Sequence, residues 1–142
     1  REGVQNIGLL SDLRRLQLGL DSGVVPSDFF AFLARLHELE ELSISGDIQG
    51  DIVPYLASLK KLRSLSLSGE FDEEHVPRFS TLSSLEELRY APYLASPHFR
   101  DQVLKELEEM RFLHRLRLTP KFLKEGPARE RIKAALPDTQ VE

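Results

Sequence analysis

Histidines and acidic residues are the side chains in this sequence that could bind a metal ion. The 142 residues include four histidines, which are His37, His75, His98 and His114. No two of them have the spacing of a metal-binding pair. His75 follows Asp72, Glu73 and Glu74, a group that could hold a cation, but an acidic run on a loop is usually only solvated. The sequence therefore predicts no metal site.

Nucleophilic catalysis is not indicated either. The chain has no cysteine, no G-x-S-x-G turn and no phosphate-binding G-x-x-x-x-G-K-[ST] loop. Ser43, Ser66 and Ser68 have no base at the spacing of a catalytic pair, and a hydroxyl without a base is a weak nucleophile. We therefore expect a non-catalytic protein that carries no cofactor.

The composition narrows the classes of partner. The formal net charge is −4, whereas a general nucleic-acid binder presents a basic face to the phosphates. No apolar run approaches the roughly 18 residues of a membrane span, and no signal peptide is visible. The chain also lacks cysteine and any N-x-[ST] acceptor, and both absences favour a reducing, intracellular setting. We expect a cytoplasmic protein that binds neither nucleic acid nor membranes.

A repeated leucine phrase supplies the elements that must position any functional side chain. Residues 59–67, LKKLRSLSL, read L-x-x-L-x-x-L-x-L. Leucines three apart suit a turn or helix end, and leucines two apart suit a strand. The third leucine of each copy, including a degenerate sixth, falls at Leu16, Leu42, Leu65, Leu88, Leu116 and Thr139. These positions are separated by 23 to 28 residues.

This phrase and its pitch resemble the leucine-rich repeat, whose period is about 20–29 residues. The resemblance covers nearly the whole chain and implies one domain over residues 1–142. The implied fold is an α/β solenoid of about six repeats, with parallel strands on the concave face and helices and irregular turns on the convex face. The predicted strands lie near residues 16–18, 42–44, 65–67, 88–90, 116–118 and 140–141.

The segments between these strands differ in length. Three of them predict longer helices, at residues 27–37, 97–109 and 128–135. Ser27 and Ser96 suit the N-cap position, and Pro97 suits the first helical position. The others are predicted as a loop, one or two helical turns, and a 3₁₀ or irregular stretch, at residues 19–26, 51–58 and 71–81. Gly46-Asp47 and Gly69-Glu70 are predicted to be turns after the second and third strands.

The two ends of the predicted solenoid differ. The opening I-G-x-L-x-x-L-x-x-L-x-L, which begins at Ile7, resembles plant-type repeats, especially those of intracellular nucleotide-binding, leucine-rich repeat immune receptors. Nothing before it would cover the apolar edge, and a solenoid end normally needs a polar cap. We therefore expect more repeats upstream of Arg1. The ending IKAALPDTQVE resembles a C-terminal cap, so the chain is expected to be the C-terminal fragment of a longer protein.

The outward side chains of the predicted sheet form three columns, because equivalent residues of parallel strands stack about 4.8 Å apart. The first column contains Arg15, Glu41, Ser64, Glu87, Arg115 and Asp138. Arg15 can pair with Glu41, and Arg115 with Glu87 and Asp138. The second contains Gln17, Ser43, Ser66, Arg89, Arg117 and Gln140. The third, made mostly of small residues, contains Gly19, Ser45, Ser68, Ala91, Thr119 and Glu142.

The second column indicates a binding site. Arg89 and Arg117 should be immediate neighbours of like charge, which is unfavourable in a sheet unless a partner offsets it. The buried asparagine that usually follows the strand of such repeats is replaced by Asp21, Asp47, Glu70, Tyr93 and Lys121. Arginine and tyrosine are enriched in binding hot spots. We predict a concave site for an acidic protein partner, formed by Arg89, Arg117, Arg115, Tyr93, Glu87, Ser66 and Ser43.

The resemblance implies a non-catalytic protein-recognition module. It would be the ligand-sensing or autoinhibitory repeats of an immune receptor in plant defence. F-box-type and bacterial leucine-rich proteins can end with a similar phrase, so the substrate-recognition repeats of an F-box-type adaptor are an alternative, as is a structural spacer. A P-loop domain upstream would indicate the receptor, an F-box helix bundle would indicate the adaptor, and a concave face indifferent to mutation would indicate the spacer.

Overall fold

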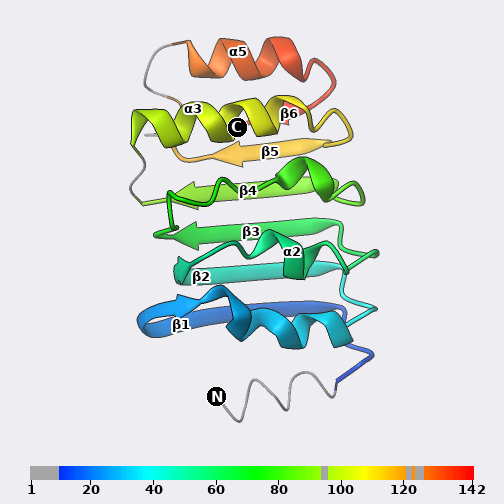
Figure 1. Ribbon diagram of the computed structural model, residues 1–142. Helices are drawn as coiled ribbons and strands as arrows, with labels where there is room; N and C mark the ends of the chain where they lie inside the picture. Colours follow the sequence, from blue (N-terminus) through cyan, green and yellow to red (C-terminus); the bar gives the residue numbers. More distant parts are fainter. Residues whose placement is uncertain (1–9, 94–95, 121–122, 124–126) are drawn as a thin grey trace.

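The computed structural model describes residues 10–93, 96–120, 123 and 127–142. Within these ranges, parallel strands form one sheet in the order β1 to β6. The strands are β1 (Arg15–Pro26), β2 (Glu41–Gln49), β3 (Ser64–Gly69), β4 (Glu87–Pro92), β5 (Arg115–Leu118) and β6 (Gln140–Val141). Figure 1 shows the connecting helices over one face of the sheet: η1 (Ser27–Arg35), α2 (Val53–Leu56), η2 (Phe79–Thr81), α3 (Pro97–Glu108) and α5 (Ala128–Ala135).

The core is a ladder of leucines on the helix-covered face of the sheet. Leu42, Leu65, Leu88 and Leu116 lie opposite one another in successive strands, and each is at most 2% exposed. Burial of one such side chain stabilises the fold by roughly 1.5–3 kcal/mol. The strands and their order are therefore as the leucine spacing predicts.

Tyr90 takes an inward leucine position in β4 and is fully buried. Its ring centroid lies 5.3 Å from that of Phe71 and 5.1 Å from that of Phe79, so three aromatic rings fill this layer of the core. Burial raises the pKa of the Tyr90 hydroxyl well above its ordinary value. Tyr90 therefore acts as a core residue and presents nothing to the open face.

Residues 19–26 are strand, so the loop predicted there is wrong. After Gly19 the register of β1 against β2 shifts, and Val24 pairs with Asp47. Gly23, at φ 68°, lies in the segment where the register shifts, in a backbone region that favours glycine. Pairing resumes because Val25 lies opposite Ile48, which is buried in the core. The same pairing places the predicted turn Gly46-Asp47 inside β2.

Residues 27–35 form a 3₁₀ helix, and the predicted cap Ser27 is wrong. Pro26 is the N-cap residue and makes no side-chain cap hydrogen bond. The reason lies in the spacing of the buried side chains. Phe30, Leu33 and Leu36 are three residues apart and fully buried, and three residues per turn places them on one face.

The register of the last strand also differs from the prediction. Gln140 pairs with Arg115 and Val141 with Leu116, two residues later than the predicted alignment. The cause is Thr139, whose amide donates to the Leu136 carbonyl at 3.1 Å and whose hydroxyl donates to the Leu113 carbonyl at 2.7 Å. Thr139 thus ends the turn and does not belong to the strand.

The remaining connections agree with the sequence. Ser96 caps α3 by accepting a 3.3 Å hydrogen bond from the Phe99 amide, and Pro97 is its first residue. Phe99, Val103 and Leu107 are buried on one face. The short helix α2 lies within 51–58, η2 lies within 71–81, and α5 follows Pro127 as predicted.

The backbone of β2 at Gly46 lies closely against the end of β3. Gly69 has φ 137°, and a Cβ added to it would lie 1.9 Å from the Gly46 carbonyl oxygen. Beside this contact the Asp47 carboxylate accepts a 3.0 Å hydrogen bond from the Glu70 amide. An aspartate therefore joins neighbouring repeats here, at the position where leucine-rich repeats usually have asparagine. The corresponding Lys121 lies outside the described residues.

Candidate functional site

The open face of the sheet, opposite the helices, has two separate hollows. We call the first the serine hollow, of about 330 Å³, and its outward-facing lining residues are Arg15, Gln17, Glu41, Ser43, Ser64 and Ser66. We call the second the arginine hollow, of about 350 Å³, and its lining includes Arg89, Ala91, Arg117, Leu118, Thr119 and Glu142. Of the predicted site residues, Ser43 and Ser66 line the first hollow and Arg89 and Arg117 line the second, while Glu87, Arg115 and Tyr93 line neither.

The arginine hollow is built on β4 and β5. Arg89 lies directly opposite Arg117 in the sheet register, as the spacing predicts. Ala91 and Leu118, both nearly buried, form an apolar floor beside the two guanidinium groups. The hollow therefore combines two positive charges with a floor of small and apolar groups.

Glu142 is a functional candidate that the sequence reasoning placed in the wrong column. Its amide donates to the Leu116 carbonyl at 2.8 Å, which continues the ladder beyond β6 and places Glu142 beside Arg117. Its carboxylate lies 2.7 Å from Arg117 Nε and accepts a 2.9 Å hydrogen bond from Gln140 Nε2. Arg117 thus already holds a carboxylate of its own chain.

Arg89 differs from Arg117 in this respect. Among the residues that the structure describes, no carboxylate lies within ion-pair distance of Arg89. The predicted like-charge neighbours are therefore compensated on one side only. Two arginines and one carboxylate leave the hollow with a formal charge of +1.

The first column mostly compensates itself. Arg15 Nε lies 3.3 Å from Glu41 Oε2, and Arg115 Nη1 lies 3.8 Å from Glu87 Oε1. Such exposed pairs contribute about 0–1 kcal/mol each. The predicted pairing of Arg115 with Asp138 is wrong, because Gln140 takes the place opposite Arg115.

Tyr93 does not join the other predicted site residues. It follows β4, its amide donates to the Gly69 carbonyl at 2.9 Å, and its side chain is 58% exposed. It lines neither hollow. Ser43 and Ser66 lie in the serine hollow, which contains no arginine pair. The structure therefore brings Arg89 and Arg117 together in one hollow. Ser66 lines the other hollow, although it lies directly opposite Arg89 in the sheet register. Tyr93 and Ser43 lie apart from the two arginines.

The acidic residues before His75, which are Asp72, Glu73 and Glu74, lie in a loop whose hydrogen bonds centre on Asp72. Asp72 accepts hydrogen bonds from the amides of Glu74 and Gly50, and His75 Nδ1 lies 3.2 Å from its carboxylate. The hydrogen bond from the Glu74 amide, more than the contact with His75, lowers the pKa of Asp72. In the described part of the chain no group of three or more potential ligands could hold a metal ion.

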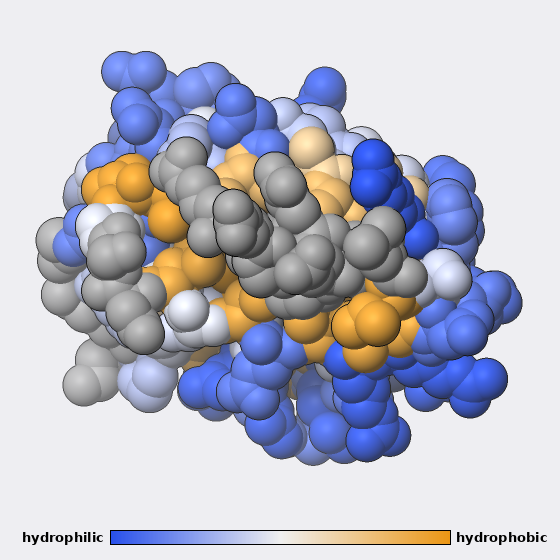
Figure 2. All heavy atoms as spheres, turned by 90° about the horizontal axis from the view of Figure 1, so that it is seen from below, coloured by the Kyte–Doolittle hydropathy of each residue, from blue (hydrophilic) through white to orange (hydrophobic). Residues whose placement is uncertain are grey.

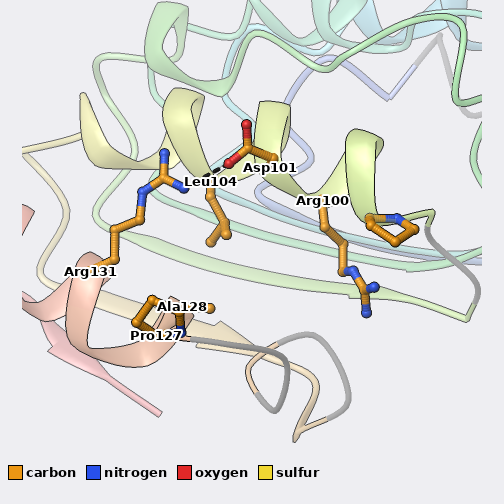
Figure 3. Close-up of a pocket in the computed structure, with 7 residues that line it drawn as sticks. Arg100, Asp101, Leu104, Pro127, Ala128 and Arg131 are labelled. Atoms are coloured by element: carbon orange, nitrogen blue, oxygen red, sulfur yellow. Dashed lines mark hydrogen bonds and ion pairs between the residues drawn. The ribbon is translucent and has the colours of Figure 1, made fainter.

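A third cavity, of about 210 Å³, lies between α3 and α5. Figure 3 shows Arg131 on α5 directed toward Asp101 on α3, and Arg131 Nη1 lies 2.8 Å from Asp101 Oδ1. Arg131 also contacts the Glu108 carboxylate. The hydrogen bond from Arg131 lowers the pKa of Asp101. These charges hold α5 against α3, so we assign this cavity a structural role.

Parallel strands in chain order, a leucine ladder and helices on one face are the architecture of a leucine-rich repeat solenoid, and the open face is its concave side. None of the helices within the described ranges has the length and apolar character needed to cross a bilayer. Such solenoids are typically non-catalytic modules that bind other proteins.

Solved structures support this fold assignment. No known protein-family profile matches the chain, and neither does any curated protein sequence. The tropomodulin C-terminal domain of Caenorhabditis elegans superimposes with a TM-score of 0.61 at 15% identity, over 96% of this chain and 91% of that one. A leucine-rich repeat protein of Leptospira interrogans gives 0.55 at 24% identity over 97% of this chain. The chain spans 33% of the length of the Leptospira protein.

Proposed function

We propose that this chain recognises a partner protein by binding an acidic segment of it in the arginine hollow. The observation that carries the proposal is the position of Arg89, opposite Arg117 and without a carboxylate from the described residues. Like charges on neighbouring strands destabilise a sheet. An aspartate or glutamate of a partner would relieve this repulsion and would gain charge-assisted hydrogen bonds.

The contact between Glu142 and Arg117 supports the proposal, because it places a carboxylate 2.7 Å from one of the two guanidinium groups. A partner carboxylate can bind Arg89 in the same way, or can replace Glu142 and bridge both arginines. The floor of Ala91 and Leu118 gives the backbone of an extended segment room to approach. Specificity would then come from the spacing of acidic residues in the partner.

The finer part of the proposal is a role in an intracellular immune receptor. There the repeats would sense a pathogen protein or hold the receptor inactive in the cytoplasm. The support is the leucine-rich repeat fold together with the plant-type phrase that begins at Ile7. The sequence encoded upstream of Arg1 tests this role. A nucleotide-binding P-loop domain there is the expected result, and an F-box there would indicate a substrate adaptor instead of a receptor.

Binding of a fluorescein-labelled hexaglutamate peptide tests the arginine hollow. Arg89→Glu combined with Arg117→Glu should weaken binding by more than about 2 kcal/mol, the level of a hot spot. The fold should be unchanged, because both side chains lie on the open face. Fluorescence anisotropy at roughly 50 and 300 mM salt gives the affinities, and salt should weaken binding to the wild type.

A matched control separates the site from the general charge. Arg14→Glu combined with Arg63→Glu changes the net charge equally, but neither residue lines the arginine hollow. This variant should lose much less affinity than the first. If the hollow variant binds as well as wild type while Ser43→Glu abolishes binding, the site is the serine hollow. If no change on the open face matters, the proposal is wrong.

A further inference from the structure

Side-chain burial changes sharply at the N-terminal end of the solenoid. Leu16 in β1 is only half-buried, whereas its partner Leu42 in β2 is 2% exposed. Leu18 is half-buried, and its partner Ile44 is buried. Leu10 opens its phrase and is 54% exposed. Equivalent leucine positions of the phrase are thus buried in the interior of the solenoid and more accessible to solvent at this end.

Apolar side chains gather at this end. Viewed from it, Figure 2 shows several groups of hydrophobic side chains, with polar side chains at the margin. The half-buried side chains that pack at this end come from β1, η1 and the phrase before β1, and they are Leu13, Leu16, Leu18, Leu20, Phe29 and Phe32. Apolar patches rimmed by polar residues mark interaction surfaces.

Within the described ranges, no strand pairs with the outer side of β1. β1 lies at one edge of the sheet and pairs with β2 on its other side. Its twelve residues therefore present a row of amide and carbonyl groups beside the exposed leucines. A partner for this end must offer both a strand for the edge and apolar side chains for the layer behind it.

We infer that this end docks a further leucine-rich repeat, which precedes Leu10 in the parent protein and pairs in parallel with β1. The argument is continuity with the interfaces already present. From β2 to β5, each strand pairs in parallel and in register, and each interface buries the leucines of two neighbouring phrases. The open positions Leu16 and Leu18 are the ones that such a repeat would cover.

Hydrogen exchange tests this inference on the 142-residue chain and on the longer protein that its gene encodes. In the 142-residue chain, amides of Leu16 and Leu18 should exchange roughly a hundredfold faster than those of Leu65 and Leu67, because a terminal repeat opens locally. In the longer protein, the two β1 amides should slow by about the same factor.

Three results would overturn the inference. The first is a gene that encodes no L-x-x-L-x-x-L-x-L phrase upstream of Arg1. The second is exchange in β1 as slow as in β3 already in the 142-residue chain. If that slow exchange depended on protein concentration, a second copy of the chain would be what covers β1. If it did not, residues 1–9 would be what covers β1. The third is fast exchange of β1 in the longer protein.

A grafted repeat tests the same surface with sequence already in hand. A copy of residues 36–58 placed directly before Leu10, in place of residues 1–9, repeats the natural distance between Leu36 and Leu59. It should slow the β1 amides at least tenfold and raise the melting temperature. The control graft carries Leu42→Glu and Ile44→Glu in the copy and should do neither. Equal exchange with both grafts would mean that β1 cannot accept a stacked repeat.

Discussion

The two ends of this solenoid are built from the same leucine phrase but reach different degrees of burial. At the C-terminal end, α5 and the short β6 cover the last full repeat, and Leu116, Ile132 and Leu136 are almost completely buried. At the N-terminal end, Leu16 occupies the same place in its phrase as Leu116 and is only partly buried. Burial is therefore a property of the stack and of its neighbours, because one repeat cannot cover its own core.

The open face shows a second contrast between the two halves. The serine hollow and the arginine hollow share the second column of outward side chains of one sheet. Only the outward side chains differ, with Ser43 and Ser66 in one half and Arg89 and Arg117 in the other. The scaffold is thus repeated while the charge is not, and the charge locates the candidate site in the C-terminal half.

The largest expected difference between the ends is in stability. Leu116→Ala should lower the free energy of unfolding by about 2–5 kcal/mol, because it empties a fully buried position. Leu16→Ala removes the same atoms from a partly buried position and should cost less, about 1 kcal/mol. Urea denaturation of the two variants measures both values. Equal losses would mean that the N-terminal end is as well covered in solution as the C-terminal end.

Glycine substitution should give the next largest contrast, between the interior of the stack and its edge. Gly69→Ala in β3 introduces a Cβ against the Gly46 carbonyl at positive φ and should cost about 1–3 kcal/mol. Gly19→Ala in β1 is the control, since an added Cβ there meets no atom within 4 Å. Thermal melts of both variants would measure the difference in stability. A destabilised Gly19→Ala chain would contradict the open space around Gly19.

The regular part of this fold was predictable because the leucine spacing encodes it directly. Five strands, the cap Ser96 and the neighbouring arginines Arg89 and Arg117 follow from counting residues along the phrase. Counting works wherever a full set of leucines holds the register. It also predicted which columns of side chains would lie on the open face of β1 to β5.

The irregular parts were not predictable, because tertiary pairing decides them. Residues 19–26 read as a loop by composition, yet the buried Ile48 of β2 draws Val25 into the sheet. The register of β6 depends on the Thr139 hydroxyl, which reaches a carbonyl of the preceding turn. In this register Glu142 lies beside Arg117, and no local pattern in the sequence signals it.

A pH dependence should distinguish the cap of the C-terminal end. The hydrogen bond from Arg131 lowers the pKa of Asp101 in the folded state. The contribution of this hydrogen bond to stability is therefore complete above the unfolded pKa of Asp101, about 4, and is lost as the pH falls through the folded pKa. Amide exchange in α5 should accelerate, relative to β3, below about pH 4. Asp101→Asn should accelerate it at pH 7 and reduce the pH dependence, and a pH-independent wild type would refute this role.

The smallest expected effect concerns Glu142. Its carboxylate pairs with Arg117, whereas no carboxylate of the described residues pairs with Arg89. If a ligand carboxylate must compete with Glu142 for Arg117, then Glu142→Gln should strengthen binding of hexaglutamate. An exposed ion pair contributes at most about 1 kcal/mol, so the gain should not exceed roughly fivefold. Glu41→Gln is the matched control, because Glu41 contacts Arg15 beside the serine hollow and its loss changes the net charge equally. The two variants therefore separate competition within the arginine hollow from the general charge of the face. A weaker complex with Glu142→Gln would show instead that Glu142 orients Arg117 for the ligand.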